Sequence, residues 1–213
     1  MKVKIKKGVK VKEFKLINSW SDVTLETWLK LIDFETGTKT EEATETIAAL
    51  SDIPKKLVKE LALSDVAVIM SKVGELQAKQ DTKLKRLIEI NGISYGFHPD
   101  LDSITLGQYA DIETFIKNGI ETNLPELMAV LYSPVKEKKN DIYIVDAYDG
   151  DIRLRAEEMK KMSSEQVQGA LVFFYTFARV LSEILPLYLM QKLKETKAQQ
   201  QEMTSQVNGD GLE

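Results

Sequence analysis

The residues of this 213-residue chain best suited to chemistry are its single histidine and a run of aspartates. His98 precedes Pro99 and Asp100, and a histidine beside a carboxylate can act as a general base. No nucleophile motif such as G-x-S-x-G accompanies it. A histidine that caps a loop explains the same residues more simply. We therefore expect no catalytic residues, and we predict that the protein is not an enzyme.

The acidic run Asp141, Asp146, Asp149 and Asp151 invites comparison with a calcium-binding loop. Such a loop needs a glycine at its sixth position, and counting from Asp149 that position is Leu154. The aspartates are better explained by turns, which favour them. Cysteine is absent, and neither a phosphate-binding loop nor a dinucleotide fingerprint occurs. We expect no metal and no cofactor.

The first 16 residues carry seven lysines and one glutamate, whereas the whole chain has a net charge of −4. A basic arm could bind nucleic acid or an acidic partner. The alternation of lysine with apolar residues instead favours a hairpin whose exposed lysines prevent pairing with other sheet edges. Both interpretations involve the side chains of Lys2, Lys4, Lys6, Lys7, Lys10 and Lys12. Nucleic acid is the less favoured partner of this arm.

A weak internal duplication is the most informative pattern. Val23-Thr24-Leu25-x-x-Trp28 returns 81 positions later as Ile104-Thr105-Leu106-x-x-Tyr109. The register then holds without a gap as far as Leu50 and Leu131, with apolar residues mostly facing apolar residues. Repeated units are packing modules. The pattern therefore favours a scaffold or binding protein.

The predicted fold is mainly α, of the α+β class, with duplicated helical units that each follow a short β-hairpin. The second hairpin spans residues 86–97 and turns at Asn91-Gly92, a strong type I′ signal. In the first unit we predict helices from about residue 23, from 41 to 50, from Pro54 as first helical residue, and from 64 to 80. Residues 136–155 form an insertion in the second unit, with a strand at 141–145. The predicted parts are a lysine-rich hairpin arm (1–18), a first helical unit (19–82), a second unit (83–192) and a flexible tail (193–213).

A long, buried helix is predicted near the C-terminus. Ser163-x-x-Gln166 forms a capping box at its start. Two adjacent apolar stripes follow, so most of the helix circumference requires burial, in the core or against a partner. Arg179 and Glu183 in its middle argue against a membrane span. The candidate partner-binding residues are Phe173, Phe174, Phe177, Leu181, Leu185 and Tyr188.

At the level of pattern, the chain resembles assembly proteins of tailed bacteriophages, particularly the tail assembly chaperones. The residues that carry this resemblance are Trp20-Ser-Asp-Val-Thr-Leu-Glu-Thr-Trp28, the segment 53–63, Ile104-Thr-Leu-Gly-Gln-Tyr109 and Leu131-Tyr-Ser-Pro134. The resemblance covers roughly residues 19–185, and its motifs are degenerate. It implies a helical, non-enzymatic protein that binds a long structural protein during tail assembly.

Three functions follow from these patterns. The preferred one is a phage morphogenesis protein, a tail assembly chaperone whose helical apolar surfaces bind a structural client. A structural virion component, such as a neck, connector or tail subunit, is the alternative, and a nucleic-acid-associated protein is less favoured. The expected partners are phage structural proteins and a second copy of the chain, with no membrane. Residues 1–15 contain no continuous apolar signal segment, so we expect the host cytoplasm or the virion as the location.

Overall fold

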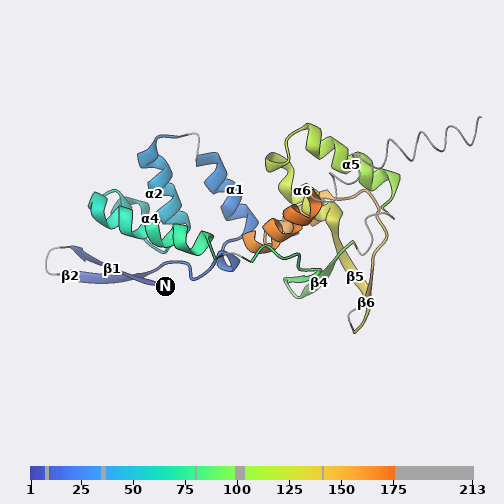
Figure 1. The fold of residues 1–213 in the computed structure, drawn as a ribbon, viewed down its shortest axis with the longest axis horizontal. Helices are drawn as coiled ribbons and strands as arrows, with labels where there is room; N and C mark the ends of the chain where they lie inside the picture. Colours follow the sequence, from blue (N-terminus) through green and yellow to red (C-terminus); the bar gives the residue numbers. More distant parts are fainter. Residues whose placement is uncertain (8–9, 35–36, 80, 99–103, 141, 176–213) are drawn as a thin grey trace, which may run out of the picture. The chain divides into compact units, whose positions relative to one another are not determined.

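The computed structural model describes residues 1–7, 10–34, 37–79, 81–98, 104–140 and 142–175. Its fold is α+β, as predicted, with helices and two small antiparallel sheets (Figure 1). The contacts divide the chain into a unit from Met1 to Ala170 and a unit from Leu171 to Glu213. Only residues 171–175 of the second unit are described, and they are helical.

The first part of the larger unit, residues 1–82, is called the first half below. It contains a hairpin and then helices, coloured blue to teal in Figure 1. Its core is formed by buried apolar side chains from both the hairpin and the helices, among them Ile5, Trp20, Ile47 and Ile69. The elements are β1 (Lys2–Lys7), β2 (Lys10–Lys15), η1 (Trp20–Asp22), α1 (Leu25–Phe34), α2 (Lys39–Ala49), α3 (Lys55–Val58) and α4 (Leu63–Gln77).

The lysine-rich hairpin packs on this core through its apolar face. Ile5 is buried, and Val3 and Phe14 are partly buried against the same cluster. The side chains of Lys2 and Lys4 are exposed on the other face, so the predicted alternation is confirmed in β1. It is wrong in β2, because Lys12 pairs with Ile5 and lies on the same face as Ile5, while Val11 is 58% exposed. The side chains of Lys6, Lys7 and Lys10 lie outside the described residues.

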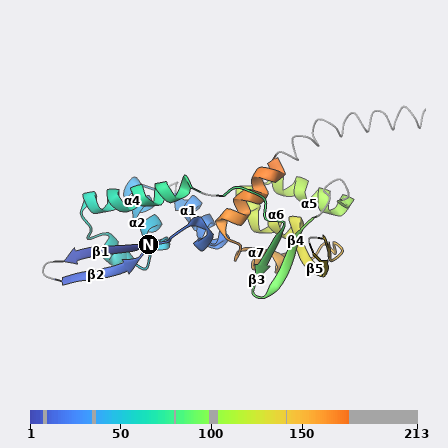
Figure 2. The ribbon, with the colours of Figure 1, turned by 60° about the horizontal axis from the view of Figure 1, so that its bottom comes forward.

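Residues 83–170, the second half, contain a four-stranded antiparallel sheet of order β3-β4-β5-β6 (Figure 2). The predicted Asn91-Gly92 turn is confirmed, because both residues have positive φ (52° and 78°) between two paired strands. The elements are β3 (Leu87–Ile90), β4 (Ile93–Phe97), α5 (Leu106–Lys117), η3 (Glu121–Asn123), α6 (Leu124–Leu131), β5 (Tyr132–Lys139), β6 (Ile142–Val145), α7 (Arg153–Met159) and a helix that starts at residue 164.

Several predicted boundaries need correction. Pro54 is the N-cap of α3 and not its first helical residue. Helix α2 begins at Lys39, two residues earlier than predicted, because Thr38 and Glu41 form a capping box. The sequence did not predict β5, whose outer half is Lys136–Lys139 and carries no apolar alternation. Its pairing with β4 and β6 forms it.

Backbone hydrogen bonds recur 81 residues apart in the two halves. The amide of Ile17 donates to the carbonyl of Leu50 (3.0 Å), and the amide of His98 donates to that of Leu131 (2.8 Å). Each bond joins the end of a hairpin to the end of a helix. Further pairs with this offset are the strand contacts Leu16–Ser51 and Phe97–Tyr132, and the helix caps Thr24–Thr27 and Thr105–Gln108.

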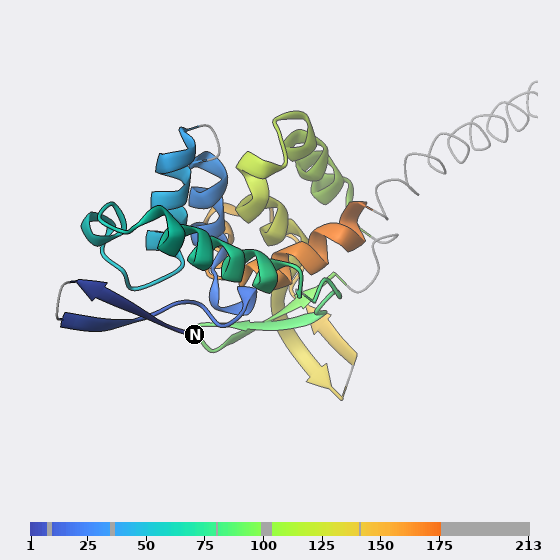
Figure 3. The ribbon, with the colours of Figure 1, turned by 60° about the vertical axis from the view of Figure 1, so that its left-hand side comes forward.

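From α3 onward the offset becomes 101 residues. Val66 donates to Ala62 at the start of α4, and Val167 donates to Ser163 at the start of the last helix, both at 3.1 Å. The bonds Lys59–Lys55, Glu60–Leu57 and Leu61–Val58 likewise match Lys160–Ala156, Lys161–Glu158 and Met162–Met159. The offset changes between Ser133 and Ala156, the stretch in which β5 and β6 project as a hairpin (Figure 3).

Candidate interaction surface

Of the residues first considered for chemistry, Asp100 and Asp141 lie outside the described residues, and His98 and Asp149 have structural contacts. The amide of His98 donates to the carbonyl of Leu131 at the end of β4. Asp149 accepts a bond from the amide of Asp151 (3.1 Å) and lies 3.5 Å from the guanidinium of Arg155, which is the arrangement of a turn. Among the described residues, no three His, Cys, Asp or Glu side chains are placed to hold a metal ion.

Buried tyrosines anchor the second half through hydroxyl groups that donate hydrogen bonds. The Tyr132 hydroxyl donates to the carbonyl of Lys85 (2.8 Å), and the Tyr143 hydroxyl donates to that of Phe97 (2.6 Å). Burial raises the pKa of Tyr132 well above its usual range, so the group stays neutral. Tyr132 ties the linker, residues 78–86 between α4 and β3, to the sheet, and Tyr143 ties β6 to β4.

The junction between the two halves contains a network of polar contacts. Thr24, just before α1, forms an antiparallel bridge with Ser163. The amide of Leu25 donates to the carbonyl of Met162, and the amide of Ser164 donates to that of Val23, both at 2.7 Å. The start of α1 therefore pairs with the start of the helix at residue 164, in the manner of two short antiparallel strands.

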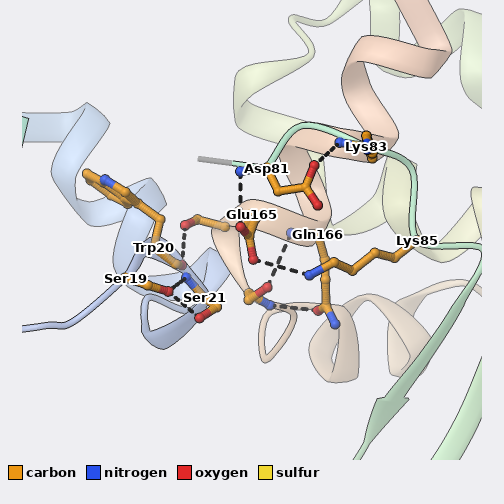
Figure 4. A network of polar contacts seen from close by, with 10 residues as sticks. Ser19, Trp20, Ser21, Asp81, Lys83, Lys85, Glu165 and Gln166 are labelled. Carbon is orange, nitrogen blue, oxygen red and sulfur yellow. Dashed lines mark hydrogen bonds and ion pairs between the residues drawn. The ribbon is translucent and has the colours of Figure 1, made fainter. Parts of the chain in front are cut away.

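Side chains reinforce this junction (Figure 4). The hydroxyl of Ser164 is buried and donates to the carbonyl of Trp20 (2.8 Å). Glu165 accepts a bond from the amide of Asp81 (3.1 Å) and one from the ammonium of Lys85 (3.2 Å). The capping box predicted for Ser163 and Gln166 is confirmed in both directions, at 3.2 and 3.0 Å. Glu165 therefore ties the linker to the last helix.

Only one helix start of each half is buried at the junction. Leu25 and Ser164 are fully buried there. The residues at the two recurring offsets are Leu106, 81 residues after Leu25, and Leu63, 101 residues before Ser164. Leu106 is 83% exposed and Leu63 is 87% exposed, although each is the first residue of a helix. These two leucines are therefore exposed where Leu25 and Ser164 are buried.

Beside Leu63 lies an open cavity of about 820 Å³ between α2 and the start of α4. Its apolar lining includes Ala43, Val58, Leu61, Leu63 and Val66. Four residues of the second half that lie 81 or 101 positions later are almost fully buried: Leu124, Met159, Met162 and Val167. In the first half, by contrast, Leu63 is exposed, and Leu61 and Val66 are partly buried.

A second apolar surface lies on β6, which is an edge strand in the order of the described sheet. Ile142 is 77% exposed and Ile144 is 55% exposed, while Tyr143 between them is buried. Edge strands usually carry lysine or proline on such positions to prevent pairing with other chains. Isoleucine here gives an apolar edge.

Of the predicted partner-binding residues, only Phe173 and Phe174 are described. Phe174 is buried and meets Tyr175 edge-to-face, with ring centroids 6.1 Å apart. Phe173 is partly buried. The others lie outside the described residues: Phe177, Leu181, Leu185 and Tyr188.

Sequence reasoning missed Leu63, Leu106, Ile142 and Ile144 as surface residues. A leucine at the first position of a helix, next to its cap, was the available signal in two cases. Its exposure could be recognised only by comparison with Leu25 in the folded chain. Isoleucines on a strand indicate an exposed edge only when the strand order is known.

Comparisons with known proteins found no match: no family model, no curated protein and no solved structure is similar to the chain. Among the described residues, no helix combines the length and hydropathy that a bilayer crossing requires.

Proposed function

We propose that the chain is a duplicated helical module, each copy a β-hairpin followed by helices, with a long buried helix at its C-terminal end. The backbone bonds that recur with offsets of 81 and then 101 residues support this proposal, because they join equivalent elements. The hairpins differ in length: 13 positions separate the paired residues Lys2 and Lys15, whereas nine separate Leu87 and Gly96. Loop lengths change readily between related modules. The β5–β6 hairpin is an insertion in the second copy.

The function we propose is that of a non-enzymatic phage morphogenesis protein, a tail assembly chaperone acting in the host cytoplasm. The sequence resemblance described above suggests the family, and the exposed apolar edge of β6 is the observation that carries a binding role. An extended segment of a structural client can add to this edge by backbone hydrogen bonds. Ile142 and Ile144 would then pack against alternate side chains of the client.

The helical surface near Phe173 is the second part of this proposed client site. Val172 and Tyr175 are exposed, and Phe174 is buried in the same helix. The apolar stripes continue in the sequence through residue 188. A client bound there would cover a helix face that is apolar around most of its circumference.

Quantitative mass spectrometry of purified particles and of the infected lysate would test the function. Abundance in the lysate with absence from particles is the result expected for a chaperone. A fixed copy number in particles would instead identify a structural subunit such as a connector. The same experiment should include a variant chain with the double substitution Ile142→Lys and Ile144→Lys. We expect this variant to lose the co-purification of one tail structural protein.

Ile93→Lys is the matched control for that experiment. Ile93 is also an exposed isoleucine of the four-stranded sheet, but it lies on β4 and pairs with Ile90 of β3, away from the β6 edge. The control should keep the client. Equal loss of the client in both variants would contradict a site on the β6 edge.

A further inference from the structure

We propose that the protein assembles head to tail, with the start of α5 of one copy docking on the first half of the next copy. The occupant of the open surface beside Leu63 is thus a second copy of this chain. The inference rests on the proposed duplication and is independent of the client. The contact that joins the halves within one chain serves as its template.

The internal junction is heterologous, since it uses different surfaces of two equivalent modules. The first half contributes Thr24 and Leu25, and the second half contributes the segment from Met162 to Ser164. A heterologous contact between like units leaves one unused surface at each end and can repeat in an open or closed series. An isologous contact, in which both units use the same surface, would leave no such surface unused.

The two unused surfaces are complementary by this template. The 81-residue offset equates Thr105 and Leu106 with Thr24 and Leu25, and both threonines cap their helices with the same 3.2 Å bond. The 101-residue offset equates Ala62 with Ser163. Thr105 of one copy would therefore bridge to Ala62 of the next, and the amide of Leu106 would donate to the carbonyl of Leu61.

Burial supports this pairing from both sides. Leu106 is an apolar side chain almost completely exposed at the start of α5. The cavity of about 820 Å³ beside Leu63 is large enough for a leucine, and its lining includes apolar side chains together with charged groups such as Lys39, Glu41 and Lys59. In the second half, the residues equivalent to the apolar part of this lining are buried: Leu124, Met159, Met162, Ser164 and Val167. Docking of Leu106 would cover the exposed leucine and the open cavity together.

Sedimentation velocity over a range of concentrations, with Leu106→Glu and Leu63→Glu, tests the proposal. The unsubstituted chain should form a concentration-dependent series of oligomers. Each variant alone should lose the series, with association weakened about tenfold or more, because burial of one leucine is lost and a charge is placed in the contact. Leu154→Glu, at a leucine of α7 that is 76% exposed and on neither surface, should associate normally.

A mixture of the two variants gives the decisive result. The Leu63→Glu chain keeps an intact Leu106 and the Leu106→Glu chain keeps an intact Leu63, so the mixture should form a 1:1 dimer and nothing larger. No recovery in the mixture, or normal association of either variant alone, would overturn the proposal. A fully monomeric unsubstituted chain at high concentration would also overturn it.

Cysteine cross-linking separates this proposal from the duplication and from the client hypothesis. The chain has no cysteine, so introduced pairs can be interpreted directly. Thr24→Cys with Ser163→Cys should close within one chain, because bridged antiparallel residues have suitable spacing. A mixture of Ala62→Cys and Thr105→Cys chains should yield a disulfide-linked heterodimer. Formation of the first cross-link but not of the second would support the internal junction and contradict the head-to-tail contact.

Discussion

Leu25 and Leu106 lie 81 residues apart at the starts of two helices, yet Leu25 is fully buried and Leu106 is 83% exposed. Each is the first residue of a helix, and each follows a threonine whose hydroxyl accepts a bond from the backbone three residues later. Local sequence therefore forms the same helix start twice. Only the first helix start is buried, at the junction where the amide of Leu25 donates to the carbonyl of Met162.

This asymmetry predicts different effects for the same substitution. Leu25→Ala should lower the free energy of unfolding by about 2–5 kcal/mol, since it removes a fully buried side chain from the junction. Leu106→Ala should change it by no more than about 0.5 kcal/mol in dilute protein, because an exposed side chain loses little on truncation. Urea unfolding of both variants at the same low concentration measures the difference. Equal losses would contradict the assignment of Leu25 to a one-directional junction.

Two helical glycines provide a matched pair for the linker contact. A Cβ at Gly169 would lie 2.5 Å from the carbonyl oxygen of Lys83, whereas a Cβ at Gly74 of α4 would meet nothing within 4 Å. Gly169→Ala should cost about 1–3 kcal/mol, because the linker backbone must move. Gly74→Ala should stabilise by up to about 1 kcal/mol, through helix propensity. Thermal unfolding tests both, and a stabilising Gly169→Ala would show that the linker does not pass so closely.

The buried tyrosine hydroxyl predicts loss of stability in alkali. Burial raises the pKa of Tyr132 in the folded protein above its unfolded value of about 10. The contribution of neutral Tyr132 to the free energy of unfolding is therefore complete below a pH of about 10. It is lost as the pH rises above that value, by up to about 1.4 kcal/mol per pH unit. Urea unfolding between pH 9 and 11 should show this fall. Tyr132→Phe should have a shallower fall, and an unchanged slope in that variant would assign the effect to other groups.

The elements that the sequence predicted well are those determined by neighbouring residues. The Asn91-Gly92 turn and the capping box of Ser163 and Gln166 depend on residues no more than three apart, and both are present. The α+β class and the alternation of Val3, Lys4 and Ile5 in β1 follow in the same way.

The parts that could not be predicted depend on contacts distant in sequence. The outer half of β5 carries Lys136, Lys138 and Lys139, so its strand pairing comes from β6 and not from its own pattern. The bridge between Thr24 and Ser163 joins segments separated by 139 positions. No local signal indicates which of two equivalent helix starts will be covered, because the choice depends on how the halves pack.

The lysine-rich hairpin supports a final prediction that separates its two interpretations. Ile5 is buried in the core of the first half, while Lys4 beside it is exposed. Ile5→Ala should lower the free energy of unfolding by about 2 kcal/mol or more, because a buried side chain leaves a cavity, and Lys4→Ala should change it by about 0.5 kcal/mol at most. Fluorescence of the buried Trp20 follows the unfolding of this core. If Ile5→Ala were neutral while Lys4→Ala abolished binding to a DNA duplex, the hairpin would be an electrostatic arm and not part of the core.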